Sequence, residues 1–351
     1  MKVWQIATGE TGRDYSSLFL EHDIMIIGPS LELGDASVNP EKYCEGGSNS
    51  ENRQVYNFVN KPESGDRVIM RLGKKVIAIG QIPKGAENQY SYQMQFKCVY
   101  GWELCHTRRV LWTKKNIPDS VKKVFATRKQ IPSFTEVHEP LNIVKEVETF
   151  NEANFNRPLK QLPSVDYMDY SEDELGRELF KKGISNKNIE DIIKALNQAD
   201  RLTSWYNSKN SGRYPTENEV VSHIILPIFL GLGWSHQQIA VEWKRVDMAL
   251  FKATPTTEKN CVMIVEAKGL GKPLGDVIEQ PLEYMKKLSL KNVKIIVTTD
   301  GANVFLYAVE NGDVYEDPVG FFNVNHLQKE YVLPSKTNLV DTLVMLQPSS
   351  L

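Results

Sequence analysis

The chain has 351 residues, with 42 Lys and Arg against 44 Asp and Glu, a formal net charge of −2, 41% hydrophobic and 25% charged residues. These values indicate a folded globular protein with room for two or three cores of about 100–200 residues each, and argue against a disordered chain or a wholly basic nucleic-acid-binding protein. The apolar run over 224–230 is much shorter than the roughly 20 residues that span a bilayer, and the first residues, MKVWQIATGE, lack an apolar signal core. We therefore expect a cytoplasmic protein that makes no membrane contact.

The charge is unevenly distributed along the chain. Residues 1–160 carry 22 Lys and Arg and 19 Asp and Glu, whereas residues 161–351 carry 20 and 25. Within the first half, residues 106–129 hold eight basic residues and one acid, Asp119. This run predicts a basic face in the first half. The four cysteines form no Cys-x2-Cys pair, so structural zinc is not expected.

The first part of the chain has the pattern of a strand-rich domain over residues 1–130. Short apolar runs bounded by turn residues predict strands, whereas apolar positions at helical spacing predict helices. We expect strands at 3–6, 24–27, 68–70, 76–82 and 93–99, and helices at 14–22 and 53–60.

Two connecting segments follow. Residues 131–170 are rich in proline and polar residues and predict a linker with one short helix at 141–150, while 171–213 predict a helical connector. The last domain, 214–351, has the order α-β-β-β-α-β-β. Its expected elements are a helix at 216–232, strand-forming residues at 239–251, a strand at 261–265, a helix at 275–288, and strands at 293–298 and 303–309. A mixed sheet flanked by helices, and an α/β (α+β) protein overall, follow from this order.

Two charged residues end the most apolar strand of the last domain. Glu266 and Lys268 follow the run Cys-Val-Met-Ile-Val, and Asp247 lies on the preceding strand. Carboxylates are ligands that suit Mg²⁺, and a neighbouring ammonium can position or deprotonate a water and stabilise developing charge. The Ala267 carbonyl and the Glu217 carboxylate are further candidate ligands. An isolated Asp…Glu-x-Lys pattern is more often a surface ion pair, so the order of the surrounding elements has to decide between the two interpretations.

That order resembles the PD-(D/E)XK nuclease domain of type I restriction enzyme motor subunits. The resemblance covers Thr216-Glu217 with Ile225-Leu226-Pro227 and Leu232-Gly233-Trp234, Arg245 to Leu250, Ile264 to Lys268, Gln280 with Tyr284, and Val297 to Gly301. Two positions depart from the family pattern: Val246 stands where Pro or Ala is frequent, and Asp300 replaces Asn.

The resemblance assigns roles to residues of this chain. It implies metal ligation by Asp247, Glu266, Ala267 and Glu217, a catalytic role for Lys268, and a place for Gln280 and Tyr284 beside the site, where they would contact DNA. The expected metal is Mg²⁺, with Mn²⁺ as a substitute. The phosphate-binding Gly-x4-Gly-Lys-Ser/Thr loop is absent, since 269–273 has the wrong spacing, so no nucleoside triphosphate is expected.

The first domain resembles the EVE and YTH-like branch of the PUA superfamily. The resemblance rests on residues 2–10, on 26–28, on Gly65 to Ile69 with Ile77 to Gly80, and on Arg108 to Trp112. It implies a small β-barrel with helices that holds a modified base in an aromatic pocket, for which Trp4, Tyr15 and Trp102 are the candidates. For any one of these rings, a place in the core is the competing interpretation. Arg108, Arg109, Lys114 and Lys115 are candidate contacts to the DNA backbone.

Together these features predict a modification-dependent, type IV-like restriction endonuclease that acts in phage defence. We expect it to bind double-stranded DNA bearing modified bases, most simply modified cytosine, and to act as a homodimer. The helices at 171–206 are a candidate for the dimer interface, but we favour the alternative that they pack onto the nuclease core. Three alternatives remain open: a nuclease subunit of a larger defence complex, an RNA-directed nuclease, and a non-catalytic nucleic-acid-binding protein built on a nuclease scaffold.

Overall fold

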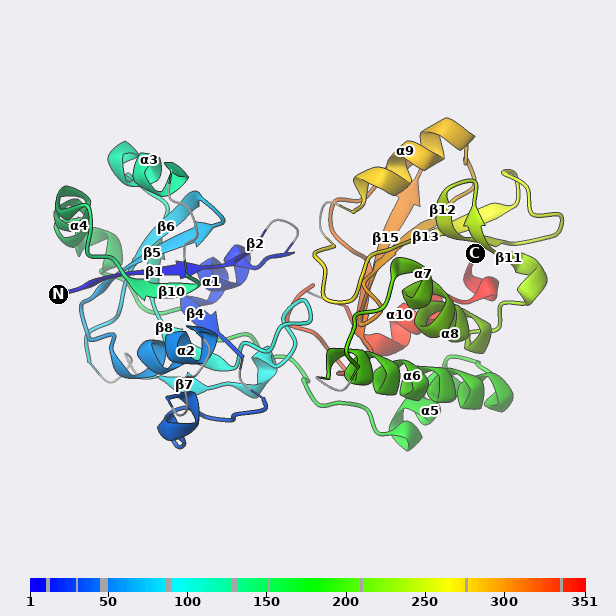
Figure 1. Cartoon of the computed structure of the whole chain (residues 1–351), viewed down its shortest axis with the longest axis horizontal. Helices are drawn as coiled ribbons and strands as arrows, with labels where there is room; N and C mark the ends of the chain where they lie inside the picture. Colours follow the sequence, from blue (N-terminus) through cyan, green and yellow to red (C-terminus); the bar gives the residue numbers. More distant parts are fainter. Residues whose placement is uncertain are drawn as a thin grey trace. The chain divides into compact units, whose positions relative to one another are not determined.

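The chain folds into two compact units, Met1–Ser164 and Val165–Leu351, each with its own sheets and helices (Figure 1). The structure, a computed structural model, describes residues 1–10, 13–29, 31–44, 50–85, 90–127, 132–150, 152–208, 211–274, 277–334 and 337–351. Over these residues no helix is both long and apolar enough to cross a membrane. The mixed content of helices and strands confirms the predicted α+β class.

The N-terminal unit contains a five-stranded sheet of order β10-β1-β5-β6-β9 and a three-stranded sheet of order β4-β8-β7. Strands β1 and β5 are parallel, and the other pairs are antiparallel. The chain passes from β8 in one sheet to β9 in the other through Val110. The strands are β1 (Val3–Ala7), β2 (Gly9–Glu10), β3 (Arg13–Asp14), β4 (Ile24–Ile27), β5 (Arg67–Leu72), β6 (Lys75–Gln81), β7 (Ser91–Tyr92), β8 (His106–Arg109), β9 (Leu111–Thr113) and β10 (Phe134–Glu136).

Helices contribute one side of the core of this unit. Val121 and Phe125, one helical turn apart, and Ile143 and Val147, likewise one turn apart, are buried in a cluster with Ile69. Sequence patterning did not predict the first of these two helices, which begins inside the basic run. The helices are α1 (Ser16–His22), α2 (Ser50–Asn60), α3 (Asp119–Thr127) and α4 (Leu141–Glu148), with 3₁₀ turns η1 (Pro40–Tyr43), η3 (Met94–Phe96) and η4 (Glu152–Phe155).

Two expectations for this unit are wrong in detail. The strands of the described residues form open sheets, with β9 and β10 at the edges of the larger one, where a small closed barrel was expected. The expected strand at 93–99 is replaced by η3, because the Phe96 amide donates to the Gln93 carbonyl and the Lys97 amide to the Met94 carbonyl, closing a tight turn.

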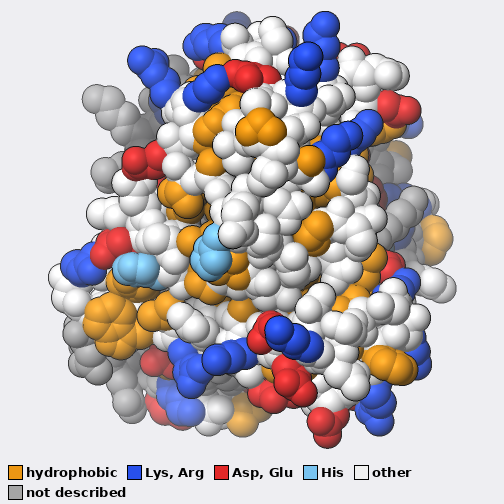
Figure 2. Space-filling view, turned by 90° about the vertical axis from the view of Figure 1, so that its right-hand side faces the viewer, with side chains coloured by type: hydrophobic (Ala, Val, Ile, Leu, Met, Phe, Trp, Pro, Cys, Tyr) orange, Lys and Arg blue, Asp and Glu red, His pale blue; other side chains and the backbone are white. Residues whose placement is uncertain are grey.

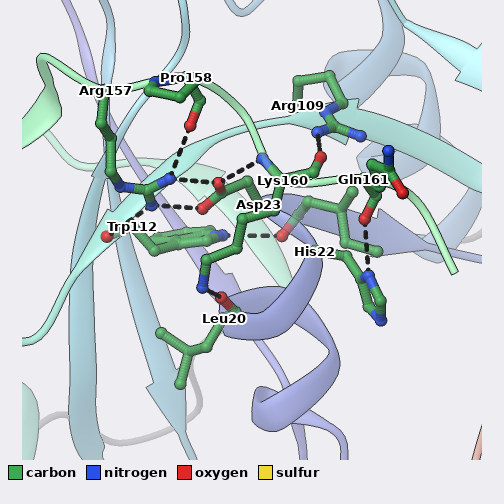
Figure 3. Close-up of polar contacts among 10 residues, drawn as sticks. Leu20, His22, Asp23, Arg109, Trp112, Arg157, Pro158, Lys160 and Gln161 are labelled. Atoms are coloured by element: carbon green, nitrogen blue, oxygen red, sulfur yellow. Dashed lines mark hydrogen bonds and ion pairs between the residues drawn. The ribbon is translucent and has the colours of Figure 1, made fainter.

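The segment expected to be a linker belongs largely to the N-terminal unit. Its residues 134–136 form β10, and residues 157–161 lie against α1 and β9 (Figure 3). Arg157 donates hydrogen bonds of 2.5 and 2.6 Å to the fully buried Asp23 carboxylate, and the Lys160 amide donates a third at 3.0 Å. Arg109 donates to the Lys160 carbonyl, and His22 Nδ1 lies 2.7 Å from the Gln161 carbonyl oxygen. These contacts fix the end of the unit to its sheet.

The C-terminal unit is built on one mixed sheet of order β11-β12-β13-β14-β15-β16, with β17 paired to β15. The β13–β14 pair is parallel and the others are antiparallel. Every residue of β13 is buried, as expected for a central strand. The strands are β11 (Ile239–Trp243), β12 (Val246–Phe251), β13 (Cys261–Ala267), β14 (Ile295–Thr299), β15 (Asn303–Glu310), β16 (Asp313–Val314) and β17 (Gly320–Asn323).

Helices lie on both sides of this sheet in Figure 1, with α9 on one side and α8 and α10 on the other. The expected helix at 216–232 contains a π-helical turn, η5, and the missing N–H of Pro227 accounts for a broken ladder at this point. The helices are α5 (Glu172–Lys181), α6 (Asn186–Asn207), α7 (Glu217–Glu219), η5 (Val220–Ile225), α8 (Leu226–Gly231), η6 (His236–Gln238), α9 (Glu279–Leu288), α10 (Leu339–Met345) and η7 (Pro348–Ser350). Both α5 and α6 belong to this unit.

Charges of both signs are interspersed on the face of the molecule shown in Figure 2. Lys and Arg side chains lie beside Asp and Glu side chains, so neither sign dominates that face. The acidic balance of the second half of the chain is therefore not gathered there.

Candidate active site

The predicted catalytic residues meet at the edge of the C-terminal sheet. Asp247 is the second residue of β12, and Glu266 and Ala267 end the neighbouring strand β13. Pairing of Met248 with Val265 brings the start of β12 beside the end of β13. The Ala267 amide donates a 2.7 Å hydrogen bond to Asp247 Oδ2, which holds the carboxylate at this edge.

Glu266 is a buried carboxylate with only one of its oxygens paired. Its side chain is 1% exposed, and Lys268 Nζ donates a 2.6 Å hydrogen bond to Oε1. Oε2 is buried and has no hydrogen-bond partner among the described residues. Burial raises the pKa of Glu266 to about 7, although Lys268 opposes this increase.

Electrostatic interactions connect these residues to Glu217. Burial raises the pKa of Asp247, against the Ala267 hydrogen bond, and the charge of Glu217 adds to that rise as it does for Glu266. Burial lowers the pKa of Lys268, but its bond to Glu266 and the nearby carboxylates outweigh this effect and leave the pKa raised. The lysine is therefore an ammonium at neutral pH. Glu217 is exposed at the first position of α7.

The fit of this site to Mg²⁺ depends on the number of carboxylates required. In the part of the chain that the structure describes, no group of three His, Cys, Asp or Glu side chains is close enough to hold a metal ion. Mg²⁺ commonly keeps several waters and is held by one or two carboxylates. Asp247 and Glu266 supply two, and the unpartnered Oε2 of Glu266 has the free lone pairs that a cation would take up. The two carboxylates therefore fit a hydrated Mg²⁺, whereas Glu217 is related to them only through its charge and, among the described residues, does not complete a group of three.

Over the residues that the structure describes, Gln280 and Tyr284 on α9 form a hydrogen bond with each other and not with the carboxylates. Gln280 Nε2 donates a 2.8 Å hydrogen bond to Tyr284 Oη, one helical turn away. Gln280 is exposed and Tyr284 is partly exposed. The described contacts include no hydrogen bond from either residue to Asp247 or Glu266.

Two further residues at this edge were not singled out as site residues from the sequence. Glu242 contributes to the raised pKa of Asp247, and its Oε1 accepts a 2.8 Å hydrogen bond from Asn218, the residue after Glu217. Asp300 is 1% exposed and accepts bonds from the backbone amides of Asn303 at 2.7 Å and of Gly271 at 3.2 Å, so it joins the end of β14 to the loop after Lys268. The sequence signals for Asp300 were its place in the Asp-Gly pair at a strand end and its match, as a replacement for Asn, to the family pattern.

The N-terminal unit has a cavity of about 440 Å³ that contains two of the three predicted aromatic residues. Tyr15 and Trp102 lie edge to face there, with ring centroids 6.0 Å apart and an interplanar angle of 78°. The Arg13 guanidinium lies 5.1 Å from the centroid of the Trp102 ring. Polar groups at the cavity come from Glu51, Glu103 and Ser133.

Trp4 is not part of that cavity, which corrects the prediction for this residue. Its ring is 1% exposed and stacks on Phe134 at 5.1 Å, and its indole N–H donates to Asp66 at 2.8 Å. A ring that is covered on its face and bonded at its nitrogen belongs to the core and is not free to hold a base.

The four basic residues predicted to contact the DNA backbone divide into two pairs. Arg108 is buried and donates to the carbonyls of Phe58, at 2.7 Å, and Val59, so it caps the end of α2. Arg109 donates to the Lys160 carbonyl (Figure 3). The prediction of a backbone contact is therefore wrong for Arg108. Lys114 and Lys115 are exposed, and residues 128–129 of the basic run lie outside the described residues.

Comparison with known proteins adds one match. Residues 4–138, which run from the second residue of β1 to just beyond β10, match a family described as a domain of unknown function, DUF8426. No curated protein and no solved structure matches the chain. The resemblance to PD-(D/E)XK nucleases and to EVE-type readers therefore stays a prediction from the sequence.

Proposed function

We propose that this protein is a Mg²⁺-dependent endonuclease that acts on DNA containing modified bases, as type IV-like restriction enzymes do. The observation that carries the proposal is Glu266, a buried carboxylate with one unpartnered oxygen beside Asp247 and Lys268. Leaving a charged group buried and half-satisfied costs stability. A cation that binds the unpartnered oxygen of Glu266 would offset this cost, which is a physical reason for a carboxylate at this buried position.

The residues of the site have separable tasks in phosphodiester hydrolysis. Mg²⁺, when bound, supplies Lewis-acid chemistry at the phosphate. Lys268, held as an ammonium by Glu266, donates hydrogen bonds to a phosphate oxygen or to the attacking water and so stabilises the negative charge of the transition state. Asp247 is oriented by the Ala267 amide, which keeps its other oxygen available. The raised pKa of Lys268 favours a donor over a general base.

The cavity with Tyr15 and Trp102 is the candidate reader of the modified base. Its volume suits a small planar ligand, and two aromatic rings offer stacking surfaces to a base that has left the helix. The exposed Lys114 and Lys115 lie on the same unit, and we assign them contacts to phosphates, which do not read sequence.

A homodimer has a candidate surface between α5 and α6. A groove of about 820 Å³ runs along these helices, and Phe180 at its border is 61% exposed. Along α5 the groove is acidic at one end, with Glu172 and Asp173, and basic at the other, with Lys181. Two antiparallel copies of α5 would pair these opposite charges about a two-fold axis, which favours a second copy of this chain as the occupant.

The test uses two plasmids of identical sequence, one with modified cytosines and one without, incubated with the protein and Mg²⁺. Preferential cutting of the modified plasmid supports the proposal, and Tyr15→Ala and Trp102→Ala should remove the preference but keep the basal cutting. Equal cutting of both plasmids by the native protein would exclude the reader, and cutting of RNA in place of DNA would favour the RNA-directed alternative. An intact protein that binds DNA but never cuts it would favour a non-catalytic scaffold.

A further inference from the structure

The hairpin that leads into Asp247 has an unusual turn. Trp243 of β11 pairs with Val246 of β12, so the loop between them has two residues, Lys244 and Arg245. Both have left-handed backbones, with φ of 51° and 79°. Two-residue hairpin loops with positive φ at both positions strongly favour Asn-Gly, because Cβ crowds the backbone in this conformation, which glycine avoids and the short polar side chain of asparagine tolerates.

The strain extends over most of the tip. Glu242, just before Trp243, is also left-handed, with φ of 52°. Sparsely populated backbone conformations of this kind persist where the surrounding structure over-determines them, and they cluster at functional sites. Here the tip is anchored through the bond from Asn218 to Glu242, next to Glu217 on α7.

The two side chains of the loop are cationic, and in the described part of the chain one of them has no hydrogen-bond or ion-pair partner. Lys244 Nζ lies 5.1 Å from the centroid of the Trp243 ring and forms an ion pair with Glu258, and its side chain is 46% exposed. Arg245 is exposed, and within the described ranges its guanidinium has no hydrogen bond or ion pair. The tip therefore presents a free guanidinium two residues before Asp247.

A cation at this position reduces the electrostatic repulsion between the carboxylates of the site and a bound nucleic acid. Asp247, Glu266, Glu217 and Glu242 together repel a polyanion such as DNA, and the single positive charge of Lys268 offsets only part of this repulsion. Positive charge in addition to Lys268 and a bound Mg²⁺ therefore favours the binding of phosphates next to the carboxylates. The guanidinium fork matches two phosphate oxygens.

We infer that the Lys244–Arg245 tip binds the phosphate backbone of the nucleic acid next to the hydrolysed bond, with Arg245 as the principal contact and Lys244 as a second one. This inference rests on the proposed function and adds to it the element that holds the strand at the site. The unfavourable turn residues are retained because the turn must carry charge.

The test replaces the turn by the residues that its geometry prefers, in the double variant Lys244→Asn/Arg245→Gly. The matched control, Lys291→Gln/Lys294→Gln, removes two exposed lysines just before β14, near the opposite end of the parallel β13–β14 pair from Glu266. Binding of a fluorescent DNA duplex is measured without divalent metal over a range of salt concentrations, and melting temperature is measured in parallel.

We expect the turn variant to melt at a higher temperature than the native protein and to bind DNA about tenfold more weakly, with a salt dependence reduced by about one per lost phosphate contact. The control should bind as the native protein does. A turn variant with native affinity and salt dependence would overturn the inference while leaving the proposed function intact. A native protein that binds no DNA at low salt would overturn both.

Discussion

Replacing Glu266 by glutamine should make the protein more stable in the absence of metal. The side chain is 1% exposed, and burial raises its pKa from the ordinary 4.5 to about 7. Each tenfold change in a protonation equilibrium is worth about 1.4 kcal/mol, so keeping this carboxylate ionised at pH 8 costs about 3 kcal/mol of stability. Glutamine has nearly the same shape without the charge, and it still offers an oxygen to Lys268.

The assay is denaturant unfolding of the native protein and Glu266→Gln at pH 8 with EDTA, repeated with Mg²⁺. We expect the variant to gain up to about 3 kcal/mol in EDTA, and Mg²⁺ to stabilise only the native protein, since a ligand of the folded state adds stability by mass action. Glu316→Gln, at an exposed position of the same unit, should change neither quantity. A Glu266→Gln protein that is less stable than the native one in EDTA would refute the reasoning that the buried charge is held at a cost.

Three other predictions follow from contacts elsewhere in the chain. Burial raises the pKa of Asp23, but the hydrogen bonds from Arg157 and the Lys160 amide outweigh this effect and leave the pKa below its ordinary value. Asp23→Asn should therefore lower the free energy of unfolding by about 2 kcal/mol in denaturant at neutral pH. This difference between the two proteins should shrink below about pH 4, where acid protonates the native carboxylate. His106 lies between Tyr43 and Tyr90, with Asp35 bonded to Tyr90, and burial lowers the pKa of this histidine to about 4. Because the unfolded chain takes up a proton at this residue near pH 6.5, the free energy of unfolding should fall by up to about 3 kcal/mol between pH 6.5 and 4. The variant His106→Gln should lose less stability over that interval. Phe180→Asp should shift the mass measured by light scattering from dimer to monomer, and so should Glu172→Lys/Asp173→Lys, while adding Lys181→Glu to the latter should restore the dimer; a monomeric native protein would remove the α5–α6 interface.

The end of the sheet that carries Asp247, Glu266 and Lys268 could be predicted from the sequence because local patterns determine it. The apolar run of β13 identifies a central strand, and the charges that end it have to lie at the sheet edge. Asp247 joins them because β12 and β13 are neighbours in the chain as well as in the sheet. The Glu242 carboxylate was missed because its position depends on a turn whose residues, Lys244 and Arg245, do not have the composition of a two-residue turn.

Predictions failed where distant segments decide the position of a side chain. Nothing near Arg108 in the chain distinguishes it from the exposed Lys114, because its partners are the carbonyls that end α2. Trp4 and Trp102 are both aromatic residues of a strand-rich segment, and the sequence does not distinguish them. Trp4 belongs to the core because the ring of Phe134, from a distant segment, packs against its indole ring. The helix α10 was detectable in principle, since the Asn338 side chain caps it by accepting from the Asp341 amide.

The central claim is hydrolysis of DNA by Asp247, Glu266 and Lys268, and the rate of plasmid cleavage by matched variants tests it most directly. Native protein and Lys268→Met, compared at equal concentration after confirming equal melting temperatures, are incubated with supercoiled modified plasmid in Mg²⁺ or in EDTA. We predict cleavage by the native protein in Mg²⁺ only, and a rate at least about 100-fold lower for Lys268→Met, as when a transition-state donor is removed. Undiminished cleavage by Lys268→Met, or no cleavage by the native protein on any plasmid, would contradict the account.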